Sequence, residues 1–213
     1  MKLFGFFRSS AAFRVRIALN LKGLPWEDGF IHLRRGDQRG EEYLGINPQG
    51  LVPALETDGA TLIQSMAIVE YLDETHAEPP FLPRDPLERA RVRALAAIVA
   101  CDIHPINNLR VLRYLSRPLG HDQATIEAWY NHWIAVGFEA IERLLAADPR
   151  TGAFCHGDAP GLADIALVPQ VFNSERYSLD LSPYPTIGRI YQTCMGLDAF
   201  AAAHPNNQPD RDD

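Results

Sequence analysis

A proline-rich segment divides this chain into two parts with different residue patterns. Residues 76–86 contain four prolines, and proline interrupts helices and central strands because it lacks a backbone N–H and has a fixed φ. Before this segment, strand-like and helix-like stretches alternate, whereas the periodic stretches after it have helical spacing. The sequence therefore predicts two domains, a mixed α/β domain over residues 1–80 and an all-helical domain over residues 87–213.

The expected elements of the first domain follow the order β-α-β and then β-β-α. The patterns predict strands over 3–6 and 26–33, a hairpin over 52–63 that turns at Asp58-Gly59, and helices over 11–22 and from residue 65. The charged residues 34–42 are expected to form a mobile loop. This order is typical of a small α/β sandwich.

The second domain opens with a helix-start pattern. Asp85 can cap, Pro86 suits the first helical position, and Glu88 lies three residues after the cap. This helix is expected to continue to Leu115 with a kink near residues 101–105, because Pro105 removes a backbone hydrogen bond. Further helices are expected over 125–145, 164–172 and 185–197, and a tail without regular structure from residue 204 onward.

Composition limits the compartment and the partners. The net charge of -7 argues against nucleic acid or an anionic membrane as the main partner. There is no apolar run of membrane-spanning length and no signal-peptide pattern after Met1, so a cytoplasmic location is expected. The three cysteines form no C-x-x-C pair, which suits a reducing compartment, and the histidines show no metal-ligand spacing, so no metal is expected.

Two serines stand where the first expected strand meets the first expected helix. Ser9 and Ser10 precede apolar residues at helical spacing. By itself this pattern favours a helix cap, in which a hydroxyl accepts from free N–H groups of the first turn. The alternative use is chemical. A helix N-terminus stabilises an anion, and a thiol held there loses its proton more easily.

Several short motifs together resemble the zeta class of cytosolic glutathione transferases over essentially the whole chain. They are Ser9-Ser10 with Arg14-Val15-Arg16-Ile17-Ala18-Leu19, Asn47-Pro48, Val52-Pro53, Gln64-Ser65, Asp102-Ile103-His104-Pro105, Asn107-Asn108 and Leu167-Val168-Pro169-Gln170. The resemblance implies an α/β plus all-α fold, with an N-terminal thioredoxin-like domain followed by a C-terminal helical bundle. It also implies glutathione as the cofactor and a homodimer.

The resemblance assigns glutathione contacts to particular residues. One serine hydroxyl would donate to the glutathione sulfur and hold it as a thiolate; Ser9 is favoured and Ser10 supports it, or one serine caps while the other holds the thiolate. Val52, before a cis proline, would pair with the cysteinyl backbone. Gln64 and Ser65, at a helix start where Ser65 is also a fair cap, would bind the γ-glutamyl carboxylate.

Three further positions are expected to touch the remaining parts of the ligands. Gln38 is expected among the glutathione contacts. His104 lies at the expected kink, and His104 or Asn108 is expected to touch the glycine end of glutathione or the substrate. Without the resemblance, a single histidine in a helix would be a packing or surface residue.

Three arginines are expected to bind a substrate with carboxylates at both ends. Arg8 adjoins the serines, Arg110 lies beyond the expected kink, and Arg176 lies near a helix end. The planar guanidinium matches a carboxylate and stays charged. Taken one at a time, each arginine would be read as a solvated surface charge.

Two positions depart from the family pattern. Many zeta-class members have a cysteine where this chain has Ala11, so no second thiol is available there. A serine or threonine usually stands where this chain has Gly161, three residues before Asp164. Glycine is expected to cap by backbone freedom alone, at a cost of a few tenths of a kcal/mol, and Asp164 is expected to be structural.

The activity that the resemblance implies is cis–trans isomerisation of a double bond conjugated to carbonyl groups. The glutathione thiolate would add to the alkene, allow rotation, and leave again. The first substrate candidate is maleylacetoacetate, giving fumarylacetoacetate in tyrosine and phenylalanine catabolism. Alternatives are maleylpyruvate, from gentisate or salicylate degradation, a transferase acting on α-halo acids, and a binding protein without catalysis.

Overall fold

The computed structural model describes residues 1–212, which divide into two compact units. The first unit contains Met1–Pro80 and the segment from Met195 onward, and the second contains Phe81–Cys194. The first boundary lies within the proline-rich segment. The helical domain was expected to extend to the C-terminus, but the structure groups the last segment with the first unit.

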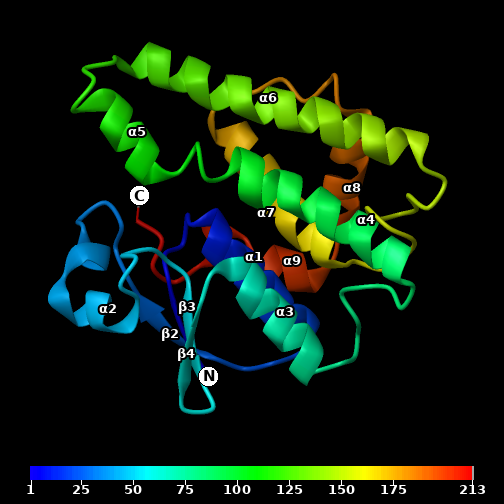
Figure 1. Cartoon of the computed structure of the whole chain (residues 1–213), viewed down its shortest axis with the longest axis horizontal. Coiled ribbons are helices and arrows are strands. Elements are labelled where there is room, and N and C mark those ends of the chain that lie inside the picture. Colours follow the sequence, from blue (N-terminus) through cyan, green and yellow to red (C-terminus); the bar gives the residue numbers. More distant parts are fainter. Residues whose placement is uncertain (213) are drawn as a thin grey trace. The chain divides into compact units, whose positions relative to one another are not determined.

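The first unit is built on a mixed four-stranded sheet (Figure 1). Its strands are β1 (Lys2–Gly5), β2 (Glu27–Phe30), β3 (Ala54–Thr57) and β4 (Ala60–Ile63), in the order β2-β1-β3-β4. Strand β1 pairs in parallel with β2 and antiparallel with β3, and β3 pairs antiparallel with β4. The expected β-α-β and β-β-α order is therefore confirmed.

The two faces of this sheet are both covered. Phe4 and Ala54 face Tyr43, which belongs to α2 (Glu41–Ile46). Leu3 and Leu55, which are paired across β1 and β3 and buried, point to the opposite face. Helices α1 (Ser10–Leu21) and α3 (Ser65–Thr75) pack side by side in this unit.

Helices α1 and α3 run in the same direction. Near their N-termini, Arg14 Nη1 donates to Ser65 Oγ at 3.3 Å. Near their C-termini, Lys22 Nζ lies 2.8 Å from the Asp73 carboxylate. Because the N-terminal part of α1 contacts that of α3, and the C-terminal parts contact each other as well, the two helix N-termini lie at the same end of the unit.

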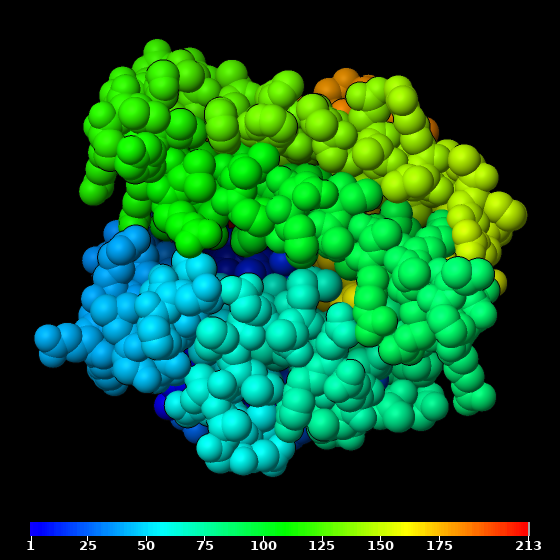
Figure 2. Space-filling model, viewed as in Figure 1, coloured from blue at the N-terminus to red at the C-terminus, as the bar shows by residue number. Residues whose placement is uncertain are grey.

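The charged stretch expected as a mobile loop contains regular structure. A 3-10 turn covers Asp37–Arg39, and α2 follows from Glu41. This segment stands at the surface of the first unit, in light blue in Figure 2. The last two residues of the expected loop instead begin α2, because Tyr43, directly after them, is only 2% exposed and packs on the sheet.

The second unit is helical. Its elements are α4 (Pro86–Ala97), a π-helical segment (Ile98–Ile103), α5 (Leu109–Ser116), α6 (Gln123–Ala147), α7 (Leu162–Arg176) and α8 (Pro185–Met195, whose last residue is grouped with the first unit). The expected start at Asp85 is confirmed, since its carboxylate accepts from the Leu87 and Glu88 N–H groups.

The single kinked helix expected up to Leu115 is instead two helices. Helix α4 passes into the π-helical segment and stops, and α5 starts anew with Asn108 as its N-cap. Pro105 cannot donate a backbone hydrogen bond, and the Asn108 side chain offers a new cap three residues later. The missing donor at Pro105 and the cap at Asn108 together favour two separate helices over one kinked helix.

Gly161 is required because the Phe81 backbone packs closely against it, and not because its backbone has a conformation that only glycine adopts. Its φ of -135° is ordinary extended backbone. A Cβ at this position would lie 2.8 Å from the Phe81 carbonyl oxygen, which accepts from the Leu162 N–H at 2.9 Å. Asp164, 1% exposed, accepts from the N–H groups of Gly161 and Cys155. Its predicted structural role is confirmed.

The last segment of the chain folds back onto α1. Helix α9 (Asp198–Ala203) packs against α1, and a 3-10 turn covers Pro205–Asn207. Asn20 Nδ2 donates to the Ala199 carbonyl at 2.9 Å. The tail beyond residue 204 is therefore not free of regular structure. Within residues 1–212, no helix is both long enough and apolar enough to cross a membrane.

Candidate active site

The turn between β1 and α1 places Arg8, Ser9 and Ser10. The Ser9 N–H donates to the Phe6 carbonyl at 2.9 Å, which closes the turn. Ser9 is the N-cap of α1, and its Oγ accepts from the Ala12 N–H at 3.2 Å. A hydroxyl can accept twice and donate once. The cap therefore uses an acceptor position, and Ser9 can cap and still donate its O–H to a ligand.

Ser10 differs from Ser9 in exposure. It is the first helical residue and only 5% exposed, whereas Ser9 is partly exposed. Arg8 is also partly exposed, and its guanidinium lies 5.6 Å from the centre of the Phe7 ring. Of the two hydroxyls, that of Ser9 is the more accessible.

The N-terminus of α3 receives no side-chain cap. Its N-cap residue is Gln64, which makes no capping hydrogen bond and has a φ of +71°. The expectation that Ser65 caps is wrong: Ser65 is the first helical residue, and its Oγ accepts from Arg14 instead. The first N–H groups of α3 thus lack the capping oxygen that α1 has, and a buried guanidinium lies beside them.

The peptide before Val52 is held from two sides. The Leu51 carbonyl accepts from the Tyr43 hydroxyl and from Asn47 Nδ2, both at 2.7 Å. The Val52-Pro53 bond is cis, as expected, and Val52 is half-buried. This arrangement fixes the direction in which the Val52 backbone points.

Side-chain and backbone contacts connect this turn with the start of α3. Gln64 Nε2 donates to Gln49 Oε1 at 2.8 Å. Gln38 is 5% exposed, and its carbonyl oxygen lies 2.9 Å from where a Cβ on Gly50 would stand. The structure therefore brings Gln38, Val52, Gln64 and Ser65 into one region of the first unit, and Arg14 connects Ser65 to α1.

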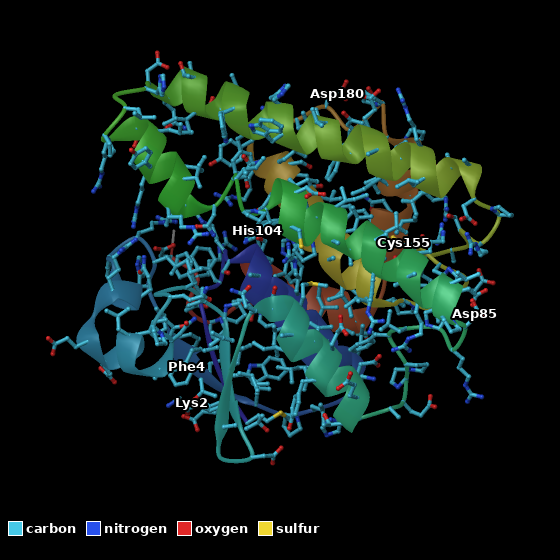
Figure 3. The ribbon with its side chains drawn as sticks, viewed as in Figure 1. Lys2, Phe4, Asp85, His104, Cys155 and Asp180 are labelled. Atoms are coloured by element: carbon cyan, nitrogen blue, oxygen red, sulfur yellow. The ribbon has the colours of Figure 1, made fainter. Side chains whose placement is uncertain are left out.

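The second unit holds the other four expected residues. His104 follows the π-helical segment and is labelled in Figure 3 where the chain leaves it. Asn108 is the N-cap of α5, and its Oδ1 accepts from the Arg110 N–H at 3.1 Å. Asn108 thus has a structural role that the sequence did not suggest, and its amide group can still donate.

Arg110 and Arg176 lie on segments that are tied to neighbouring residues of α6. Asn107, two residues before α5, donates to the Tyr130 carbonyl at 3.0 Å. Asn131 donates to the carbonyl of the residue after α7, Tyr177, also at 3.0 Å. The Tyr130 and Tyr177 rings stack with centroids 3.7 Å apart. Both arginines are exposed, and the same stretch of α6 positions them.

Three residues that support the site were not among the expected ones. They are Arg14, which is 2% exposed beside Ser65, and Tyr43 and Asn47, which hold Leu51. Arg14 had a signal in the sequence, because it is a charge in the middle of a helix whose other positions are mostly apolar. Tyr43 had none, because it follows the expected loop of residues 34–42 and no helix was expected there.

Two of the three cysteines are buried and protonated. Burial raises the pKa of the Cys155 and Cys194 thiols, which keeps both neutral. Among residues 1–212 there is no group of three or more His, Cys, Asp and Glu side chains that could hold a metal. A hollow of about 580 Å³ lies at the opposite end of the sheet from Ser9, where Lys2, Glu27 and Glu56 line it.

Comparisons with known proteins identify relatives of this chain. Residues 8–75 match the family model of the glutathione S-transferase N-terminal domain. A maleylpyruvate isomerase from Ralstonia is 52% identical over 99% of both chains. A maleylacetoacetate isomerase from Pseudomonas aeruginosa is 47% identical over 99% of this chain and 98% of its own.

Solved structures give the same result. A holo maleylpyruvate isomerase, described as a bacterial zeta-class glutathione transferase, superposes with a TM-score of 0.97 at 52% identity over 99% of both chains. A maleylacetoacetate isomerase from Methylobacterium extorquens, with bound malonate and glutathione, superposes with a TM-score of 0.95 at 44% identity over 98% of both chains. The chain belongs to the zeta class of glutathione transferases. Within that class, the relatives named here are isomerases of two maleyl keto acids.

Proposed function

We propose that this protein is a glutathione-dependent cis–trans isomerase of a maleyl-substituted keto acid. The observation that carries the proposal is the pair of parallel helices α1 and α3. One N-terminus presents the Ser9 hydroxyl, and the other is uncapped beside the buried Arg14. Glutathione needs both features, because its thiol must be held as a thiolate and its γ-glutamyl end carries a carboxylate.

The residues of the first unit fit glutathione along its length. The Ser9 O–H would donate to the sulfur, with Ser10 beside it. The Val52 backbone, held through Leu51, would pair with the cysteinyl unit. The uncapped start of α3, with Gln64 and Ser65, would receive the γ-glutamyl carboxylate, and Gln38 is a further contact.

When bound, glutathione supplies the sulfur nucleophile that adds to the double bond and leaves after rotation. The protein's own part is to keep that sulfur deprotonated, through the Ser9 hydroxyl and the positive end of α1. Arg8, Arg110 and Arg176 would bind the substrate carboxylates and offset the negative charge that develops on its oxygens. His104 and Asn108 would contact the glycine end of glutathione or the substrate. A relative solved with bound malonate and glutathione supports a dicarboxylate substrate.

Maleylacetoacetate, from tyrosine and phenylalanine catabolism, is the first substrate candidate, because relatives of that name match nearly the whole chain. Maleylpyruvate is the second candidate. It is favoured by the 52% identity to a maleylpyruvate isomerase. The two substrates differ beyond the double bond, so competition between them in one assay measures the preference directly.

The proposed enzyme acts as a homodimer in the cytoplasm. The buried free thiols of Cys155 and Cys194 suit a reducing compartment. Sedimentation velocity over a range of protein concentrations tests the dimer, and fractionation of the source cells tests the location.

The deciding experiment follows both candidate substrates by absorbance, with and without glutathione. Ser9→Ala should lower kcat about 100-fold. Ser9→Asp keeps a good N-cap but has no O–H to donate, so it should fold stably and lose at least as much activity as Ser9→Ala. Ser182→Ala, which removes an exposed hydroxyl bound only to Asp180, is the control. No turnover of either substrate by a wild-type protein that binds glutathione would contradict the proposed function.

A further inference from the structure

The backbone N–H and the backbone carbonyl of Phe7, directly before Arg8, are both hydrogen-bonded, so each of the two peptide groups that flank the Phe7 Cα is held. The Phe7 N–H donates to Asp210 Oδ2 at 2.8 Å. The Phe7 carbonyl accepts from Arg16 Nη2 at 3.0 Å. The next bond along the chain, from the Ser9 N–H to the Phe6 carbonyl, closes the turn. The partners of Phe7 therefore come from the C-terminal tail and from the body of α1.

The same arginine also anchors the end of α9. Arg16 is 4% exposed, and its Nε donates to the Ala203 carbonyl at 3.1 Å. A planar guanidinium that binds two carbonyls with different nitrogens fixes their relative positions. Arg16 thus connects the Phe7 carbonyl to the end of α9, from which the chain continues seven residues to Asp210.

Charge reinforces this arrangement. Burial lowers the pKa of Arg16 to about 10, while the Asp210 and Asp28 carboxylates oppose the shift. Arg16 is therefore protonated at neutral pH. Burial also raises the pKa of Asp210, and the bond from the Phe7 N–H and the charge of Arg16 counteract that effect. The Phe7 N–H therefore donates to an acidic acceptor, and the Phe7 carbonyl accepts from a cationic donor.

We propose that Asp210 is a positioning residue for the turn that carries Arg8 and Ser9, and that it acts through the Phe7 N–H while Arg16 holds the Phe7 carbonyl. What the turn does chemically rests on the function proposed above. The Phe6–Phe7 peptide plane is held at its N–H by Asp210 and at its carbonyl by the Ser9 N–H. The next plane, Phe7–Arg8, is held at its carbonyl by Arg16, so the two residues that follow Phe7 keep their direction. A displacement of about 1 Å at a reacting group can cost about 100-fold in rate.

Two variants of Asp210 and one control test this proposal. Asp210→Ala removes the acceptor for the Phe7 N–H. Asp210→Asn keeps an oxygen that can accept from it. Asp212→Ala is the matched control, because Asp212 lies in the same tail but pairs with His32 and Arg34. The readouts are the pKa of bound glutathione, followed by the ultraviolet absorbance of its thiolate, and kcat and KM for the preferred substrate.

Asp210→Ala should raise the pKa of bound glutathione and lower kcat about 10- to 100-fold, with the KM for glutathione little changed because Val52 and α3 are untouched. Asp210→Asn should recover most of kcat, and Asp212→Ala should match the wild type. Wild-type values in Asp210→Ala would overturn the proposal. So would equal losses in Asp210→Ala and Asp212→Ala that follow a common fall in melting temperature.

The two proposals can fail separately. If the wild-type protein isomerised neither substrate, the proposed function would fail. The pKa of bound glutathione, and hydrogen exchange at the Phe7 amide, would still report whether Asp210 positions the turn. Faster exchange at Phe7 in Asp210→Ala but not in Asp212→Ala supports the positioning role without any assay of turnover. Unchanged exchange at Phe7 in Asp210→Ala contradicts it.

Discussion

At the scale of single residues, the candidate site depends on which hydrogen-bonding capacity each side chain has left after its structural role is filled. Ser9 caps α1 through an acceptor position of its hydroxyl and keeps its O–H. Asn108 caps α5 through its oxygen and keeps its amide N–H groups. The capping and the chemical interpretations of these residues, which compete when only the sequence is known, are compatible in the structure.

Tyr43 offers a prediction at this scale that can be followed by pH. Burial raises its pKa to about 12 from 10.0, and its hydroxyl donates to the Leu51 carbonyl. Below pH 10 the tyrosine is neutral in the folded and unfolded states, so its stabilising effect is complete. As the pH rises from 10 towards 12, the unfolded state ionises first and this stability is lost.

Tyr43→Phe should therefore be less stable than wild type by about 0.5–1.5 kcal/mol at neutral pH, and the difference should shrink above pH 10. It should also raise the KM for glutathione, since the Val52 turn is then held only through Asn47. Urea unfolding at a series of pH values checks the first result. If the difference in unfolding free energy between wild type and Tyr43→Phe stayed constant up to pH 11, the raised pKa of Tyr43 would not be the cause of the stability difference.

At the scale of elements, the direction of α1 and α3 is the important feature, because it places two helix N-termini together. Lys22–Asp73 joins the two C-terminal ends, and Arg14–Ser65 joins the N-terminal ends. These two cations provide a matched pair, since each connects the same two helices and only one lies at the end where an anion is stabilised.

Arg14→Met should weaken glutathione binding about tenfold, which is about 1.4 kcal/mol, because a positive charge beside the start of α3 is lost. Lys22→Met should change glutathione affinity little. Isothermal titration of glutathione into each variant provides the comparison, and thermal unfolding reports any general damage. Equal affinities of the two variants would show that Arg14 has no special role at the anion end.

At Gly161, the N-cap of α7, helix capping and close packing predict opposite effects of a substitution. As an N-cap, serine is preferred to glycine by a few tenths of a kcal/mol, so capping alone favours Gly161→Ser. The Phe81 carbonyl lies 2.8 Å from the Cβ that this change adds, and overpacking typically costs about 1–3 kcal/mol. Gly161→Ser should therefore destabilise the protein in urea unfolding. A rise in stability would mean that the backbone near Phe81 shifts at little cost to make room for the added side chain.

At the scale of the whole molecule, the C-terminal segment packs in the same compact unit as the N-terminal residues Met1–Pro80. Phe200 in α9 is fully buried, and α9 packs on α1. Phe200→Ala should cost about 3–5 kcal/mol and should loosen the first unit in particular. Hydrogen exchange should increase over α1 while α6 keeps its protection. Increased exchange over α6 with α1 unchanged would assign the segment to the helical unit.

The sequence by itself determined the elements that depend on local chemistry. The helix start at Asp85, the β-α-β and β-β-α order, and the serines at the first strand–helix junction follow from caps, periodicity and turn residues that act over a few positions. The motif pattern also identified the family. Together these placed most of the expected glutathione contacts in one unit.

The tertiary structure decided what depends on residues far apart in the chain. Helix α2 begins at the end of the stretch expected as a charged loop because Tyr43 packs on the sheet, and Gly161 is needed because the Phe81 carbonyl lies close to it. Asp210 meets Phe7 from 203 positions away. Burial and hydrogen bonding between residues so far apart arise only when the chain has folded. Patterns that extend over a few residues therefore cannot predict them.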